Sequence, residues 1–335
     1  MKKLLFLTAV CGLLLLPVLA FSQKKPLVIK LASLAPEATP WGKALNELKR
    51  EWDRATNGEV ELIVYHNGVA GSEEDVLRKL RQNQVQAAVF TSLGMSQVSP
   101  AVMTLSVPFF IRTDEELNAV LASVRGTLEA GIESAGFKTI AWSKIGWVNF
   151  FSRNPVFVPD DLKKQKLATE SSLQAFNDSF RAMGYQLVPV STNDVLVFLN
   201  SRNLDAIYQS PINVATTQSF AVAKYMTDMK VAPFMGGIVM NEVTWRRIPE
   251  KYRERLLALS GKTVANNEAS ISSLETQAVA QMKAHGLIIN TLTPAQKETW
   301  YADVNRVIPS LVGKTYDRDV YTKIEDILTT IRSGN

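Results

Sequence analysis

The order of apolar segments in the first hundred residues constrains the fold more than any other feature of the sequence. Three short apolar segments of buried-strand type, at residues 27–32, 60–65 and 85–90, alternate with two helix-like segments that begin after Thr39 and Ser72. Alternating strands and helices build a largely parallel sheet, because each helix carries the chain back before the next strand. A similar alternation recurs later in the chain. The sequence therefore predicts an α/β protein with two sheet-containing units.

Short local motifs predict where several helices begin and end. Thr39 before Pro40 is typical of a helix start, and apolar residues then recur three and four positions apart until Asn57 and Gly58. Two capping boxes are predicted from Ser72 with Asp75 and from Thr293 with Gln296. The further expected elements are strands at 139–142, 167–168, 186–190 and 206–208, helices at 176–183 and 193–199, and mostly helix after Pro249.

Residues 1–22 have the pattern of a secretory signal peptide. Lys2 and Lys3 precede an apolar stretch over residues 4–19, and the small residues Ala20 and Ser22 suit a cleavage site. We expect export to the periplasm and removal of this segment; the alternative is a retained membrane anchor, for which the stretch is short. Lipid attachment at Cys11 is disfavoured because the preceding residue is not small. Removal would leave a chain without cysteine.

Composition and motifs argue against catalysis and nucleic-acid binding. The chain is 46% hydrophobic and 21% charged, as in ordinary globular proteins, and its net charge of +5 is too small to indicate a nucleic-acid partner. His66 and His285 lie far apart with no cysteine nearby, so no metal site is predicted. Residues 260–263 resemble the end of a P-loop but lack its earlier glycine. We predict no catalytic residue, no cofactor and no metal.

An exported chain with two α/β units and no catalytic motif indicates a two-lobed binding protein. Ligands of such folds bind beyond the carboxyl ends of the strands, which here means the loops after Leu31, Phe90 and Leu167. Five aromatic residues also crowd into positions 142–157, after the predicted strand at 139–142. They lie where the chain is expected to cross between the units, so they could line a pocket there; core packing is the alternative explanation.

Five sequence blocks, in this order, resemble the solute-binding (P) subunits of TRAP transporters, the tripartite ATP-independent periplasmic family of the dicarboxylate-binding (DctP) type. The blocks are residues 31–44, 58–80, 105–109, 159–167 and 188–205, and the resemblance covers roughly residues 27–330. It implies a two-lobed, periplasmic-binding-protein-like α/β fold with a ligand cleft between the lobes and C-terminal helices packed over both. The expected first lobe is 23–145 plus about 236–270, and the expected second lobe is 146–235 plus about 271–330.

The resemblance also indicates that this chain lacks the arginine with which the family binds the ligand carboxylate. The family's arginine that binds the ligand carboxylate falls at Ala168, a second basic or polar position falls near Val148, and an acidic or polar one falls near Thr91. Burying a carboxylate without a counter-charge is costly, so a simple dicarboxylate is not the expected ligand. We expect a ligand with a substantial hydrophobic part. The alternative is that Arg153, Arg181 or Lys144 supplies the charge from another direction.

The resemblance implies an exported subunit that closes on its ligand and delivers it to membrane permease subunits driven by an ion gradient. An accessory helical-repeat lipoprotein is a further possible partner. The alternatives are a ligand-binding protein that docks onto a sensor or such a lipoprotein without transport, or an exported hydrolase or isomerase. The candidate ligand-binding residues are Ser33, Trp41, Phe90, Thr91, Trp147, Val148, Phe150, Ala168, Tyr208 and Phe234.

Overall fold

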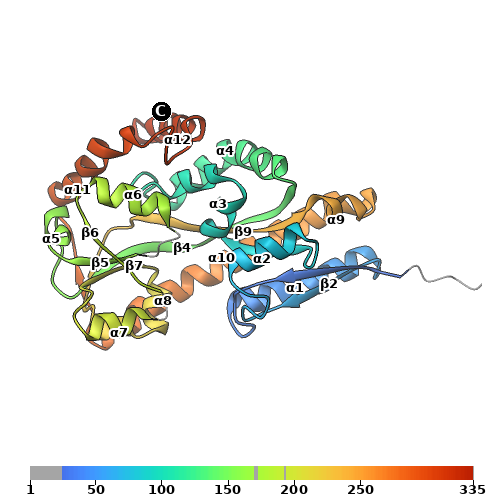
Figure 1. The fold of residues 1–335 in the computed structure, drawn as a ribbon, viewed down its shortest axis with the longest axis horizontal. Coiled ribbons are helices and arrows are strands. Elements are labelled where there is room, and N and C mark those ends of the chain that lie inside the picture. Colours follow the sequence, from blue (N-terminus) through green and yellow to red (C-terminus); the bar gives the residue numbers. More distant parts are fainter. Residues whose placement is uncertain (1–24, 170–172, 192–193, 335) are drawn as a thin grey trace, which may run out of the picture.

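A mixed sheet with helices on both sides forms the centre of the molecule (Figure 1). The structure is a computed structural model that describes residues 25–169, 173–191 and 194–334. The predicted signal peptide, residues 1–22, lies outside this part of the chain, as does Cys11. Within the described residues the sheet has ten strands, eight of them in the order β2-β1-β3-β9-β4-β7-β5-β6; β8 also pairs with β4, and β10 pairs with β8.

The first half of the sheet follows the predicted alternation. Strand β1 (Leu27–Ala32) pairs in parallel with β2 (Val60–Tyr65) and with β3 (Ala87–Thr91), and helices α1 (Pro40–Thr56) and α2 (Glu73–Arg81) connect them. The Thr39 hydroxyl accepts a hydrogen bond from the Gly42 N–H, and Asn57 ends α1 in the left-handed conformation, with φ of 51°. Ser72 and Asp75 form the predicted capping box. These elements confirm the prediction to within two residues.

Two long antiparallel strands join the halves. Strand β4 (Phe137–Ser152) pairs with β9 (Ala232–Asn241) over most of its length, and β9 also pairs antiparallel with β3. The expected strand at 139–142 and the aromatic segment after it are therefore one continuous strand, which corrects the prediction that the strand ends near Trp142. The sheet as a whole is mixed, because β9 runs against both of its neighbours.

The second half repeats the parallel arrangement with shorter strands. Strand β5 (Lys166–Thr169) lies between β6 (Gln186–Pro189) and β7 (Ala206–Gln209), parallel to both, and β7 pairs antiparallel with β4. The predicted helix at 193–199 is observed as Val195–Asn200, with Asn193 outside the described residues. The remaining elements of this half are α5 (Pro159–Lys163), α6 (Gln174–Ala182), α7 (Val195–Asn200), α8 (Pro211–Thr216), η3 (Ser219–Ala221), β8 (Tyr225–Thr227) and β10 (Ile288–Asn290).

The C-terminal helices pack over both halves, as the resemblance implied. Helix α10 (Glu250–Ala284) packs on α1 in the first half and on α8 in the second, α11 (Pro294–Val307) packs on α5, and α12 (Arg318–Arg332) packs on α4. The lobe boundary expected near residue 270 thus falls inside one helix, and α12 joins the core of the first half. The other elements are α3 (Ser92–Val98), η1 (Pro100–Ser106), α4 (Asp114–Ser134), α9 (Glu242–Arg247) and η4 (Ile308–Ser310).

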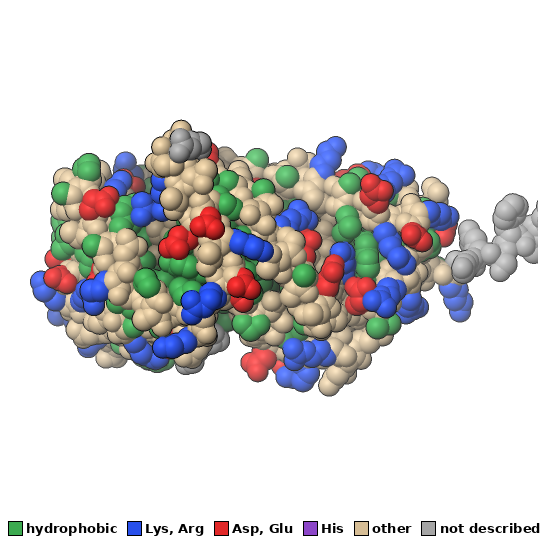
Figure 2. Space-filling model, turned by 90° about the horizontal axis from the view of Figure 1, so that it is seen from above, with side chains coloured by type: hydrophobic (Ala, Val, Ile, Leu, Met, Phe, Trp, Pro, Cys, Tyr) green, Lys and Arg blue, Asp and Glu red, His purple; other side chains and the backbone are tan. Residues whose placement is uncertain are grey.

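The surface carries both signs of charge. Figure 2 shows lysine and arginine side chains interspersed with aspartate and glutamate over the visible face, without a continuous patch of one sign. In the part of the chain that the structure describes, no helix is both long and apolar enough to span a membrane. The same residues contain no group of three or more histidine, cysteine, aspartate or glutamate side chains that could hold a metal ion.

Candidate functional site

Three predicted site residues meet at the carboxyl ends of β1 and β3. Ser33 and Phe90 line a narrow crevice there together with Glu73 from the first turn of α2. Thr91 caps α3, and its hydroxyl donates to Glu73 Oε2 at 2.9 Å. Glu73 is a polar residue of this region that the sequence analysis missed, because an acid in a helix's first turn usually only complements the helix dipole.

A groove runs between α3 and α6, which lie beside each other above the sheet in Figure 1. It encloses about 290 Å³ and is lined by Leu93 and Ser96 from α3, by Gln174 and Asp178 from α6, and by Lys314. Helix α3 follows β3 and α6 comes after β5, so the groove lies between helices that follow strands of both halves. That is where open α/β sheets bind their ligands. We call it the interlobe groove.

Four predicted residues gather in the core of the second half. Val148, Phe150, Tyr208 and Phe234 belong to one apolar cluster, in which the rings of Phe150 and Tyr208 lie 5.9 Å apart. Burial raises the pKa of the Tyr208 hydroxyl well above its usual range. We call these four residues the aromatic wall; Tyr208 of β7 contributes its hydroxyl group.

Ala168 does not join that wall. Its neighbour Leu167 packs in the aromatic cluster, whereas Ala168 packs with Phe151 and Val190 in a different cluster, as expected for successive residues of a strand. Ala168 and Tyr208 therefore face opposite sides of the sheet. Trp41 is also separate: it packs in the core between α1 and the sheet, where its indole nitrogen is buried without a partner among the described residues.

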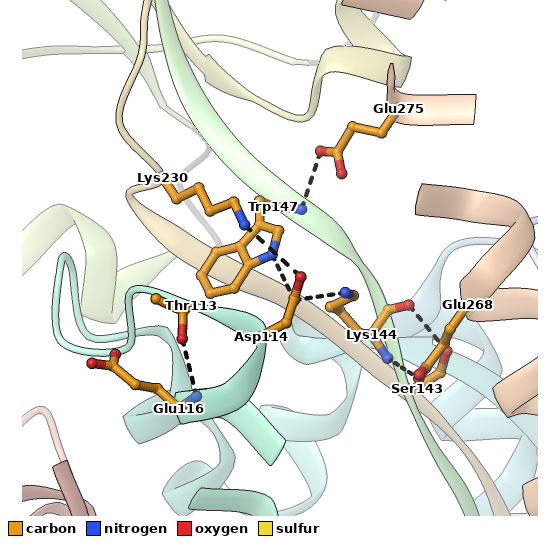
Figure 3. A network of polar contacts seen from close by, with 9 residues as sticks. All are labelled: Thr113, Asp114, Glu116, Ser143, Lys144, Trp147, Lys230, Glu268 and Glu275. Atoms are coloured by element: carbon orange, nitrogen blue, oxygen red, sulfur yellow. Dashed lines mark hydrogen bonds and ion pairs between the residues drawn. The ribbon is translucent and has the colours of Figure 1, made fainter. Parts of the chain in front are cut away.

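Trp147 lies in a polar network where β4 passes from one half to the other (Figure 3). Its indole N–H donates to Asp114 Oδ1 at 3.0 Å, and Lys144 Nζ lies 2.7 Å from the same oxygen. Burial raises the pKa of the Asp114 carboxyl, but the hydrogen bonds from Lys144 and Trp147 outweigh it and leave that pKa below its usual value. Lys230 Nζ lies 4.5 Å from the centre of the Trp147 ring.

Helix α10 binds β4 through two carboxylates at this point. The register between β4 and β9 shifts between Lys144 and Gly146. Beside this irregularity Glu268 accepts the Lys144 N–H at 2.7 Å and Glu275 accepts the Trp147 N–H at 3.4 Å. Burial raises the pKa of the Glu275 carboxyl. We call residues 143–147 of β4 the crossing segment.

A cavity of about 490 Å³ adjoins the crossing segment. Trp147 lines it, and no other predicted site residue does. Its other walls include Arg112, Lys230, Glu275 and Tyr301. The sequence analysis missed these residues because they come from four distant segments and share no motif. We call this space the crossing cavity.

Two of the three cations considered as substitutes for the missing arginine are bound to protein groups. The Arg153 guanidinium donates to the Leu199 carbonyl and lies 3.9 Å from Asp205, and Lys144 pairs with Asp114. Arg181, the third, is exposed on α6.

Two α/β halves, joined by shared strands and a spanning helix and separated by a groove at the strand ends, define a two-lobed solute-binding protein. The family model of the bacterial extracellular solute-binding proteins, family 7 (DctP), matches residues 31–315, and the chain belongs to this family. The resemblance to TRAP solute-binding subunits and the predicted two-lobed α/β fold are thereby confirmed.

Characterised relatives span most of the chain at low identity. The C4-dicarboxylate-binding periplasmic protein DctP of Rhodobacter capsulatus is 23% identical over 88% of this chain and 87% of its own. The C4-dicarboxylate-binding protein DctB of Bacillus subtilis is 23% identical over 82% and 79%.

Solved structures of TRAP periplasmic solute-binding proteins share the fold. The protein from Chromohalobacter salexigens with bound D-glucuronate has a TM-score of 0.80 at 19% identity, covering 89% of this chain and 98% of its own. The one from Shewanella oneidensis with bound succinate has a TM-score of 0.79 at 18% identity, covering 90% and 99%.

Proposed function

We propose that this protein is the exported solute-binding subunit of a TRAP-type transporter. It captures a small ligand in the interlobe groove, closes its two halves over it and passes it to membrane permease subunits. Membership of the solute-binding family, and relatives named as C4-dicarboxylate-binding proteins, support this role. The pattern of residues 1–22 supports export to the periplasm. The proposed role requires no catalytic residue, cofactor or metal.

We further propose that the ligand has a substantial apolar part. The observation that carries this is the absence of a free cation at the positions where the family resemblance expects basic residues. Position 168 is alanine, and position 148 is a valine packed in the aromatic wall. The candidate substitutes Arg153 and Lys144 are held by protein partners. Burial of apolar ligand surface would supply the affinity instead, at about 25 cal/mol per Å² before the costs of association.

The proposed ligand therefore differs from those of the structural neighbours, which hold D-glucuronate and succinate. Polar groups in the groove, among them Asp178 and Lys314, and the Glu73–Thr91 pair near its edge would bind the hydrophilic end of such a ligand. The membrane permease subunits, and an accessory helical-repeat lipoprotein if one takes part, are the proposed partners.

The direct test is to identify what the protein carries. The chain is exported from a bacterial host, purified without denaturation and extracted with organic solvent, and the extract is analysed by mass spectrometry. A stoichiometric apolar or amphipathic molecule supports the proposal. A stoichiometric small polar acid overturns the proposed ligand class and means that a basic residue elsewhere binds it. Uptake of the identified ligand by vesicles that contain the permease subunits then tests transport; uptake independent of this protein overturns its role.

A further inference from the structure

The crossing cavity has the size and position of a second binding site. Its volume of about 490 Å³ falls within the range of small-molecule pockets. Trp147 and Asn149 of β4, Lys230 before β9, Glu275 of α10 and Tyr301 of α11 contribute to its walls. None of its described lining residues belongs to β1, β3, β5, α3 or α6, so it is distinct from the interlobe groove.

Arg112 brings a positive charge without an ion pair to this cavity. Its guanidinium stacks 3.3 Å from the centre of the Tyr301 ring, and its Nε donates to the Phe109 carbonyl at 3.1 Å. Among the described residues it makes no ion pair, because the nearby Glu116 carboxylate is bound by Arg332 at 2.8 and 3.0 Å. Burial and the charge of Arg332 lower the pKa of Arg112. A half-buried cation without an ion pair is a favourable partner for an anion.

Two lysines line the same cavity. Lys230 lies over the Trp147 ring and 3.9 Å from Asp114, and half-buried Lys297 on α11 has no ion pair within the described chain. Two acids also line it, the exposed Asp228 and Glu275, whose carboxylate accepts the Trp147 N–H. Lys230 is thus paired with Asp114, and the two lining cations without an ion pair among the described residues are Arg112 and Lys297.

The remaining lining of the cavity is apolar. Pro211, Met226, Met229 and Val279 contribute aliphatic and thioether surface, while Trp147 and Tyr301 contribute aromatic rings. Such surfaces bind a flat hydrophobic group, and the cations bind an acidic group attached to it. The two features together select a molecule that is part apolar and part acid.

We propose that the crossing cavity binds a small organic carboxylate with an apolar body, its carboxylate held by Arg112 and Lys297 and its body lying between Trp147 and Val279. Trp147 is on β4, and Lys230 lies two residues before β9. These are the two strands that join the halves, so a molecule bound here contacts the part of the protein that must deform when the lobes move. Occupancy of this site would therefore influence lobe closure.

Benzoate is a suitable probe, and benzamide is its neutral counterpart of the same shape. Binding to the whole exported protein is measured by isothermal titration calorimetry. We expect saturable benzoate binding, and benzamide binding weaker by about tenfold or more, because charge-assisted hydrogen bonds are lost. Equal binding of the two probes, or no saturable benzoate binding, overturns the proposal.

Variants place the binding in this cavity. The double variant Arg112→Gln, Lys297→Gln should weaken benzoate binding by about tenfold, whereas Lys49→Gln on the exposed face of α1 should leave it unchanged. Because Arg112 also stacks on Tyr301, the filling variant Val279→Trp serves as a second, independent block. Thermal unfolding confirms that each variant is folded. Benzoate binding that survives both the double variant and Val279→Trp overturns the assignment.

The test separates this site from the proposed function. The molecule that co-purifies with the protein should remain bound in the presence of saturating benzoate, and it should still co-purify with the double variant. Displacement of that molecule in direct competition would mean a single shared site, which overturns the second site while leaving the solute-binding role intact. Failure to find any co-purified molecule would weaken the proposed function without altering the benzoate result.

Discussion

At the scale of single residues, the environment of a side chain determines its structural role more than its residue type does. Asp114 is partly exposed, yet it accepts from Trp147 and pairs with Lys144 where β4 changes halves. Asp160 also lies in the first turn of a helix, but its side chain is 78% exposed and its ion pair with one lysine is longer, at 3.5 Å. Two aspartates in the first turns of helices thus have different structural roles, and only the folded chain distinguishes them.

Replacing Ala168 tests whether the position at which the family resemblance expects an arginine belongs to the ligand site. Ala168→Arg should weaken binding of the co-purified ligand by about tenfold or more, because it adds volume and a charge at a position that is 8% exposed. It should also bring weak binding of simple carboxylates. Ala168→Met adds similar length without charge and separates the two effects. Unchanged affinity in calorimetry would mean that position 168 lies outside the site.

The structural roles that could be predicted from the sequence are those set by residues close to each other in the chain. Ser72 and Thr293 are predicted as caps because a partner side chain lies three residues on, and Thr39 because Pro40 follows it. The predicted cleft residues depended on long-range packing. The structure brings Ser33, Phe90 and Thr91 together but directs Ala168 and Tyr208 to opposite faces, because the alternation of a four-residue strand is set by its neighbours.

At the scale of elements, helix ends and the β4–α10 junction carry the specific interactions. In the capping box of α11 the Thr293 hydroxyl accepts the Gln296 N–H and Gln296 accepts the Thr293 N–H at 2.8 Å. The sequence predicted this box correctly. The junction between β4 and α10 could not be predicted, because Glu268 and Glu275 lie more than a hundred residues from the backbone groups that they bind.

Thr293→Ala should lower the free energy of unfolding by about 1 kcal/mol, the usual cost of removing a threonine cap. Thr330 is a matched control: it is exposed within α12, and its hydroxyl donates to a carbonyl four residues back. Thr330→Ala should change stability by less than about 0.5 kcal/mol. Urea unfolding of both variants makes the comparison, and equal effects of the two would contradict the assigned cap.

Glu275→Gln should alter how stability depends on pH. Burial raises the pKa of Glu275 in the folded state, so the folded protein binds this proton more tightly than the unfolded chain does. That contribution is fully present at pH values below the ordinary glutamate pKa and is lost as pH rises through the raised value. Glutamine can still accept the Trp147 N–H. The variant should therefore gain stability relative to the parent as pH increases from about 4 to about 7.

The measurement for Glu275→Gln is urea unfolding at several pH values in constant salt. A stability difference between variant and parent that does not vary with pH, or that varies in the opposite direction, would refute the assigned environment. The comparison is internal, because every other titrating group is common to both proteins.

At the scale of the whole molecule, the two halves are bound to each other by continuous elements. Strands β4 and β9 and helix α10 each contact both halves, and the C-terminal helix α12 returns to pack on α4. The alternating pattern predicted the two-unit α/β organisation. It did not predict that β9 lies between β3 and β4, because the sequence of residues 232–241 does not indicate which strands they pair with. The lobe boundaries at 145 and 235 remain predictions.

Gly146 lies in the crossing segment with φ of 146°, a conformation that side-chain-bearing residues rarely adopt. Gly146→Ala should destabilise the protein by about 1–3 kcal/mol through backbone strain. A steric clash would not contribute, because the added Cβ would lie an ordinary 3.6 Å from its nearest atom, Glu275 Oε1. It should also shift the distribution of lobe openings measured by small-angle scattering. The control Gly126→Ala, in an open helical position of α4, should be neutral or stabilising. Equal unfolding curves for the Gly146→Ala and Gly126→Ala variants would contradict the predicted strain at Gly146.

The position of β9 has a consequence for the order in which the protein can be built. The first half cannot complete its sheet from the N-terminal residues alone, because the strand between β3 and β4 is contributed by residues 232–241. During synthesis, about a hundred and forty further residues must emerge after β3 before its second neighbour is available. Such long-range closure is slow. For a chain exported as proposed above, this topology would delay the completion of folding until the chain has passed the export channel.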